Sequence, residues 1–167
     1  MKKILLILLV LPFLAESSYA QGNPEFGKGN HVINLGVGIG AHRSIPLTAS
    51  YEVCIVDGIA GKGSIGIGAI AGFRQHRYRV WGTYNTYTSF LAGFRAAFHY
   101  NFVENLDTYA GFITAASFYT TDAPSSFNMF VPGAFVGARY YLSPGFAVMA
   151  ELGEGISYVM AGVAFRF

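Results

Sequence analysis

Apolar and polar residues alternate along most of the chain after residue 30. The alternation is clearest between Phe90 and Phe102, where phenylalanine, tyrosine and alanine take every second position. Because successive side chains of a strand point to opposite faces, a period of two predicts strands with one apolar face. Both faces are mildly apolar in segment 107–119, so its facing stays open. Eight segments have the pattern: 31–40, 47–56, 63–74, 88–102, 107–119, 131–142, 146–153 and 156–167.

The connections between these segments alternate in length. The short ones, expected on the periplasmic side, are 57–62, 103–106 and 143–145. The longer ones, expected on the outer side, are 75–87 and 120–130. Short inner turns with longer outer loops are typical of outer-membrane barrels. Aromatic residues gather near the expected strand ends, Tyr109 and Tyr141 among them, which predicts two interfacial belts.

The composition favours a membrane protein built from strands. Hydrophobic residues make up 53% of the chain and charged residues only 12%, against about 25% charged in soluble proteins. Beyond the first 20 residues, no stretch is apolar and long enough for a spanning helix. A chain that crosses lipid without helices must close its strands into a barrel. The sequence therefore predicts an all-β, eight-stranded antiparallel transmembrane up-and-down β-barrel.

The N-terminus has the features of an export signal. Lys2 and Lys3 precede the apolar run 4–14, and small residues lead up to Ala20. This order predicts a secretory signal peptide cleaved after Ala20. We expect three parts: the signal peptide at 1–20, a periplasmic lead-in at 21–30 and an outer-membrane barrel at 31–167.

Three segments carry a family resemblance: Ala138-Arg139-Tyr140-Tyr141, Ala150-Glu151-Leu152-Gly153 and Gly162-Val163-Ala164-Phe165-Arg166-Phe167. With them the chain resembles small outer-membrane barrels of the OmpA/OmpX type, and within that class the outer membrane protein β-barrel, or porin-like, family of the Bacteroidetes. The resemblance implies a cell outer membrane location. It also implies that Phe165 and Phe167 form a signal read by the barrel assembly machinery. It leaves the activity open, because such barrels include anchors, adhesins, small pores and lipid A enzymes.

Five polar residues are expected to point into the barrel: Glu52, Arg95, His99, Arg139 and Glu151. A three-residue connection after Ser143 would pair Arg139 directly with Glu151. The set has two interpretations, either a salt-bridged plug or a gated polar path or proton relay. We favour the plug because an eight-stranded interior is just wide enough for side chains. Cys54 is expected on the same inward face as a small apolar side chain.

A second candidate site is a basic and aromatic patch on the outer loops: Arg43, Arg74, His76, Arg77, Arg79 and Trp81. Arginine combined with aromatic side chains can hold phosphate groups or sugars, so lipopolysaccharide or another extracellular ligand would fit. The alternative is anchoring in the headgroups of outer-membrane lipid. No nucleic-acid motif and no metal-ligand spacing occurs in the sequence, and no cofactor is expected.

Three functions remain, in order of preference. The first is a non-enzymatic barrel with a structural or surface-interaction role and a plugged polar interior. The second is a small porin-like passive channel. The third is a lipid A-modifying enzyme, whose candidate residues come from separate segments without a fixed spacing: His42, Ser44, His76, Ser89 and Glu154. The ligand, the conduction and the oligomeric state do not follow from the sequence.

Overall fold

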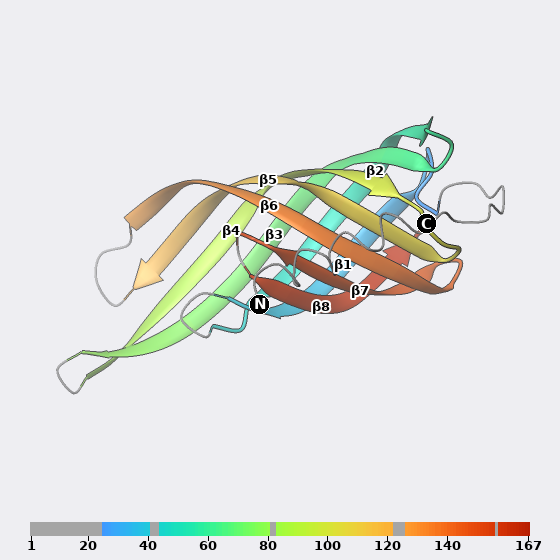
Figure 1. The fold of residues 1–167 in the computed structure, drawn as a ribbon. Helices are drawn as coiled ribbons and strands as arrows, with labels where there is room; N and C mark the ends of the chain where they lie inside the picture. The colour runs from blue at the N-terminus through green and yellow to red at the C-terminus, as the bar shows by residue number, and fades with distance from the viewer. Residues whose placement is uncertain (1–24, 41–43, 81–82, 122–125, 156) are drawn as a thin grey trace, which may run out of the picture.

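Over residues 25–40, 44–80, 83–121, 126–155 and 157–167, which the computed structural model describes, eight strands form one closed antiparallel barrel (Figure 1). The strands are β1 (His31–Ile39), β2 (Leu47–Ile59), β3 (Gly63–Val80), β4 (Thr83–Tyr100), β5 (Leu106–Thr121), β6 (Ser126–Ser143), β7 (Phe146–Gly153) and β8 (Val159–Arg166). Each strand pairs with its sequence neighbour, and β8 pairs with β1. The predicted all-β up-and-down barrel is confirmed. The expected signal peptide lies outside the described residues.

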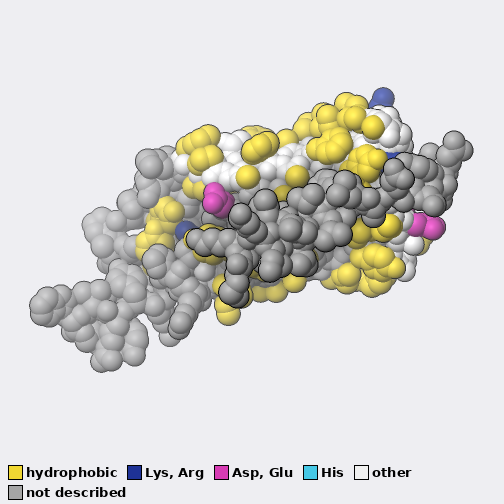
Figure 2. Space-filling model, viewed as in Figure 1, with side chains coloured by type: hydrophobic (Ala, Val, Ile, Leu, Met, Phe, Trp, Pro, Cys, Tyr) yellow, Lys and Arg dark blue, Asp and Glu magenta, His cyan; other side chains and the backbone are white. Residues whose placement is uncertain are grey.

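The outer wall carries apolar side chains in the predicted alternation. Phe94 on β4 is 72% exposed and Phe112 on β5 is 73% exposed, and Figure 2 shows hydrophobic side chains spread over the visible wall. A water-facing surface does not carry so many large apolar groups, whereas a lipid-facing one does. Others on the wall are Ile33, Leu35, Val37, Ile67, Phe90, Phe98, Val136, Val148 and Leu152. In the described parts of the chain, no helix is long and apolar enough to cross a membrane.

Strand β5, whose facing the sequence left open, turns its polar residues inward. Asp107, Tyr109 and Ser117 are buried, while Phe112 and Phe118 are exposed. The inward face is mildly apolar because Ile113 and Ala115 lie between these polar groups. Those two side chains pack against other strands inside the barrel, so they are core residues and not part of the lipid-facing wall.

The two ends of the barrel differ. At one end, here named the turn end, consecutive strands are joined by the short connections 60–62, 101–105 and 144–145. Residues 25–30 and Phe167 lie at this end, since they adjoin β1 and β8 where these strands begin and finish. Ala60 (φ 49°) and Asn105 (φ 61°) adopt left-handed backbone conformations there, as tight turns require. The opposite end is here named the hairpin end.

Both long outer loops predicted from the sequence are mostly strand, so those predictions are wrong. The β3–β4 ladder runs from Gly63↔Tyr100 to Val80↔Thr83, and the β5–β6 ladder reaches Tyr119↔Ser126. Aromatic and β-branched residues continue through both regions, and such residues favour strands. The polar residues in these regions led the prediction to end the strands too early. β2 is also longer than predicted and contains bulges near Val56, and β8 starts at Val159 instead of residue 156.

The barrel wall is consequently uneven in height. Strands β3 to β6 have 16 to 18 residues, whereas β1, β7 and β8 have 8 or 9. Figure 1 shows the β3–β4 and β5–β6 hairpins extending past the short strands at the hairpin end. A tilted strand needs roughly 9–11 residues to cross a bilayer, so β1 reaches the lower limit and β7 and β8 fall just short of it. The long strands exceed this range.

Candidate functional site

The five polar residues expected inside the barrel all lie there and are buried. Their exposed fractions are 0% for Glu52, His99 and Arg139, 2% for Arg95 and 7% for Glu151. They come from β2, β4, β6 and β7, where the alternation places them opposite the apolar outer face. The structure adds Asp107 of β5, which is 0% exposed. These six side chains are named the ionic cluster below.

His99 joins two carboxylates at the centre of the ionic cluster. Its Nδ1 lies 2.9 Å from Asp107 Oδ1 and its Nε2 lies 2.9 Å from Glu52 Oε1. An ionised carboxylate only accepts hydrogen bonds, so a ring protonated at both nitrogens satisfies both contacts. With that proton, the described cluster contains three acids and three bases and its charge is balanced. Balance matters because an unpaired charge in a dry interior is costly.

Arg139 connects four strands through one guanidinium group. Its Nε donates to Asn34 Oδ1 at 3.0 Å on β1, and its Nη1 donates to Asp107 Oδ2 at 2.9 Å on β5. Its Nη2 donates to Glu52 Oε2 on β2. The planar fork of an arginine suits several acceptors in different directions. Arg139 therefore ties β6 to walls on both sides of the lumen.

Arg95 forms the second half of the ionic cluster. Its Nη2 donates to Glu151 Oε2 at 3.1 Å and its Nη1 to Ser50 Oγ at 3.2 Å. The guanidinium lies 4.2 Å from the ring centroid of Phe135, a cation–π distance. The hydroxyl of Tyr109 also donates to Glu151 Oε2, at 3.1 Å. Arg95 thus spans the lumen from β4 to β7.

The predicted direct pairing of Arg139 with Glu151 is wrong. In the β6–β7 register, Arg139 lies opposite Met149, and Glu151 lies opposite Gly137. The connection has two residues, 144–145, instead of three, and the register shifts once more between Tyr141 and Ser143. A Cβ on Gly137 would be 2.6 Å from the Tyr109 ring. The glycine leaves space for that ring, and Glu151 bonds to Tyr109 and Arg95 instead.

Two tyrosines expected in the interfacial belts also lie inside the barrel. Tyr109 and Tyr141 are each 4% exposed. The Tyr109 ring lies 4.6 Å below the guanidinium of Arg139, and the Tyr141 ring lies 4.1 Å from that of Arg166. A position near a strand end does not tell whether an aromatic side chain lies in an interfacial belt or inside the barrel. For Tyr141 the sequence did contain a signal: it lies two residues from Arg139 on the same strand, so both side chains point to the same face.

Apolar side chains pack on both sides of the ionic cluster. One apolar layer, which starts beside the cluster at Ala97 and Tyr109 and continues toward the hairpin end, is formed by Ile70, Leu91, Ala97, Tyr109, Ile113, Ala115 and Phe135. Toward the turn end lies a second layer formed by Phe26, Val32, Cys54, Tyr141, Ala147 and Ala164. Charge interactions strengthen where water is excluded. The ionic cluster is therefore flanked by apolar side chains and buried from solvent.

The outer basic and aromatic patch is only partly described. Arg43 and Trp81 lie outside the described residues. His76, Arg77 and Arg79 belong to β3, and the backbone register places them opposite Tyr87, Thr86 and Tyr84. Arg74 is half-buried. These positions follow one another along the β3–β4 hairpin, so any binding surface they form belongs to a hairpin and not to an irregular loop.

The two phenylalanines of the expected assembly signal lie on the outer face of the closing seam. Phe165 is 41% exposed and Phe167 is 67% exposed. Phe165 lies opposite Ile33 in the β1–β8 register. The backbone of Phe167 exchanges two hydrogen bonds with His31, at 2.9 and 3.0 Å, and its ring stacks on the His31 ring. Their recognition by an assembly machinery stays a prediction.

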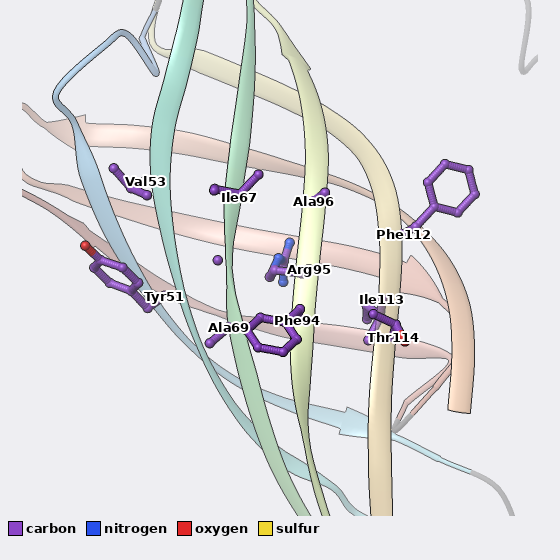
Figure 3. Close-up of a pocket in the computed structure, with 11 residues that line it drawn as sticks. Tyr51, Val53, Ile67, Ala69, Phe94, Arg95, Ala96, Phe112, Ile113 and Thr114 are labelled. Carbon is purple, nitrogen blue, oxygen red and sulfur yellow. The ribbon is translucent and has the colours of Figure 1, made fainter. Parts of the chain in front are cut away.

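A hollow of about 540 Å³ lies on the outside of the wall over β2 to β5. Figure 3 shows the Phe94 ring beside Ala69, with Tyr51 on one side of the hollow and Phe112 projecting from β5 on the other. Small side chains between large ones create this depression. It opens toward the lipid-facing surface, and its floor includes Arg95 and Ile113, whose side chains are buried.

The residues considered for catalysis do not form a hydrolytic arrangement in the described parts of the chain. Ser89 lies in the lumen with its hydroxyl 3.2 Å from that of Ser117. Ser44 is buried and Glu154 is exposed, while His42 lies outside the described residues. In the same parts of the chain, no group of three or more His, Cys, Asp or Glu residues is arranged to hold a metal ion.

No protein-family model matches the chain, and a comparison with curated proteins finds no relative. Solved structures do match in fold. Neisserial surface protein A is 13% identical, with 83% of this chain and 95% of that one covered and a TM-score of 0.56. The N-terminal β-barrel domain of Pseudomonas aeruginosa OprF is 15% identical, with 84% and 99% covered and a TM-score of 0.54. A de novo designed transmembrane β-barrel is 18% identical, with 84% and 97% covered and a TM-score of 0.53. At such identities the matches show a shared barrel fold, and the Bacteroidetes family stays a prediction.

Proposed function

We propose that this protein is an integral outer-membrane barrel that does not conduct and that supports two long hairpins above the membrane. The observation that carries the proposal is the ionic cluster, which joins opposite walls of the lumen between two apolar layers. A barrel closed in this way is a rigid membrane support. The long hairpins are then the parts available for surface contacts.

The membrane setting is supported by the outer wall. Apolar residues such as Leu35, Phe94 and Phe112 face outward from successive strands, and a closed barrel leaves no unpaired strand edge in the lipid. The fold is shared with a designed transmembrane β-barrel and with a protein named for the Neisserial surface. Export by a signal peptide at residues 1–20 and insertion guided by Phe165 and Phe167 belong to the same proposal.

The energetics of buried ion pairs support a closed lumen. Removing one partner of such a pair costs about 3–5 kcal/mol, because the other charge is left unpaired. Opening a path past Arg139 would separate it from Asp107 and Glu52 together. Spontaneous opening would therefore be rare. In the eight-stranded barrel little lumen remains beside these side chains.

A surface role would use the β3–β4 and β5–β6 hairpins. The β3–β4 hairpin contains Arg74, His76, Arg77 and Arg79 in sequence, and arginines suit phosphate groups. We propose lipopolysaccharide or another anionic extracellular ligand as the partner class. No enzymatic activity is proposed.

Conductance in a planar bilayer tests the proposal. The refolded full chain and its Arg139→Ala variant would be compared, with Phe112→Ala on the outer wall as the matched control. We expect no discrete channels from the wild type or the control. Discrete channels from the wild type, with larger steps in Arg139→Ala, would overturn the closed lumen and favour a small passive channel.

A further inference from the structure

Residues 25–30 cross the turn end of the barrel and insert one side chain into it. Phe26 is 0% exposed. Its ring centroid lies 4.3 Å from that of His99, and the guanidinium of Arg139 lies 5.7 Å from it. A Cβ on Gly66 would be 2.7 Å from the Phe26 ring. The ring therefore occupies a fitted slot directly beneath the ionic cluster.

This segment is held by a few polar contacts from separate parts of the turn end. Glu25 Oε2 lies 3.0 Å from Arg166 Nη1 on β8, and Glu25 Oε1 accepts a hydrogen bond of 3.2 Å from the Asn105 backbone. The backbone N–H of Lys28 donates to Asp57 Oδ2 at 2.8 Å. Partly exposed contacts of this kind are individually weak. Breaking them leaves every strand pair of the barrel intact.

The turn end also contains buried polar atoms that Phe26 does not satisfy. Asn101 Oδ1 and Tyr141 Oη are buried without a hydrogen-bond partner among the described residues. Asn101 directly follows β4 at the turn end, and Tyr141 shares the turn-end apolar layer with Phe26. Buried polar atoms are nearly always paired, with protein or with water. Water could satisfy these atoms if the Phe26 ring left the slot.

We propose that residues 25–30 form a displaceable stopper that controls the entry of water and small solutes from the turn end to the ionic cluster. With Phe26 in its slot, His99, Glu52 and Arg139 are sealed. With Phe26 displaced, the slot opens toward His99 and Cys54. The apolar layer at the hairpin end stays in place, so displacement creates an inlet and not a through-channel. This device goes beyond the proposed function and does not require the barrel to conduct.

Labelling of Cys54 can measure access to the slot. Cys54 is the one cysteine of the sequence and is 3% exposed, in the same apolar layer as Phe26. The rate at which a small charged methanethiosulfonate labels it would be measured on the folded full chain in detergent micelles. We expect labelling at least tenfold faster in Phe26→Ala than in the wild type. The matched control is Lys28→Ala, since Lys28 is exposed and the contact described for it uses only its backbone. An unchanged rate in Phe26→Ala, or equal acceleration in Lys28→Ala, would overturn the stopper.

Two further measurements separate the stopper from other failures. Phe26→Leu refills the slot with an apolar side chain, so we expect its labelling rate to return to within about threefold of the wild type. Heat-modifiable migration in electrophoresis should show that each variant is folded, and fast labelling of an unfolded Phe26→Ala variant would count against the proposal. Discrete channels from Phe26→Ala would show that the hairpin-end layer leaks, whereas channels from the wild type would contradict the proposed function.

Discussion

The side chains that fill the two ends of the lumen belong to different kinds of structure. At the hairpin end the closing side chains, such as Leu91, Ile113 and Phe135, belong to strands of the wall. At the turn end Phe26 belongs to a segment outside the sheet. A wall side chain leaves the lumen only if its strand changes register, which would move the whole inward face into lipid. A docked segment can leave by local unfolding. The hairpin-end side chains thus form the permanent closure of our proposal, and Phe26 forms the removable one.

The strongest way to break this comparison is to remove the ionic cluster that separates the two ends. Glu52→Ala removes one of the two carboxylates that contact both Arg139 and His99 and leaves Asp107 as the other. Two buried bases then lose a partner, and we expect a loss of about 3–5 kcal/mol in the free energy of unfolding. Urea unfolding followed by electrophoretic migration measures this loss. Glu104→Ala is the control, because Glu104 is an exposed acid at the turn end. Equal stability of the two variants would show that the cluster is dispensable.

Shortening a side chain of the hairpin-end apolar layer should have the next largest effect on stability. Phe135→Ala opens a cavity beneath Arg95, and we expect a loss of about 3 kcal/mol in the free energy of unfolding. The matched control is Phe112→Ala, since Phe112 faces outward opposite Ala134, the neighbour of Phe135. Lipid chains can fill the space that this control leaves. A larger loss in the control than in Phe135→Ala would contradict the assigned facing of β5 and β6.

Shortening Phe26 at the turn end should lower the free energy of unfolding by less. Phe26→Ala can lower the free energy of unfolding only by as much as docking of residues 25–30 contributes, and we expect about 1–2 kcal/mol. The same urea titration applies, and Lys28→Ala should match the wild type. A loss as large as that of Phe135→Ala would mean that Phe26 is part of the global core, and the distinction between the two ends would fail.

The smallest effect should come from the ion pair that helps to hold the stopper. Glu25→Gln removes the charge opposite Arg166, and we expect about 0.5 kcal/mol or less, since partly exposed pairs contribute little. Salt screens such pairs. Labelling of Cys54 in the wild type should therefore rise about twofold in 1 M salt, and this salt dependence should be absent in Glu25→Gln. A salt response retained in the variant would assign it to other charges.

Much of the barrel wall could be predicted from the sequence, because each strand has one face toward lipid and one toward the lumen. On β4, Arg95 and His99 share one parity while Phe94 and Phe98 share the other. Only one facing keeps the charged groups out of lipid, so the sequence determines it. The bounds of β7, Phe146–Gly153, are confirmed for a similar reason. Short turn residues, Pro144 and Gly145 before it, mark its start.

The contacts within the lumen could not be predicted in the same way. The pairing of Glu151 depends on a turn one residue shorter than expected and on a register shift near Tyr141, and periodicity is insensitive to a bulge. Asp107 was missed because Ile113 and Ala115 make the inward face of β5 resemble an outward one. Phe26 was missed because its neighbours are polar and glycine-rich. One signal was present, since Phe26 is the sole large apolar residue between positions 21 and 30.

The uneven height of the wall has a consequence for the surrounding bilayer. A strand of 8 residues, as in β7 and β8, rises about 26 Å along its own axis. Tilted by about 40°, it covers roughly 20 Å of membrane thickness, less than the apolar band of about 25 Å that outer-membrane barrels present. Lipid beside β7, β8 and β1 must then compress, while lipid beside the tall strands keeps its natural thickness. The protein would stand in a membrane that is thinner on one flank, and neighbouring barrels would lower this distortion by meeting flank to flank.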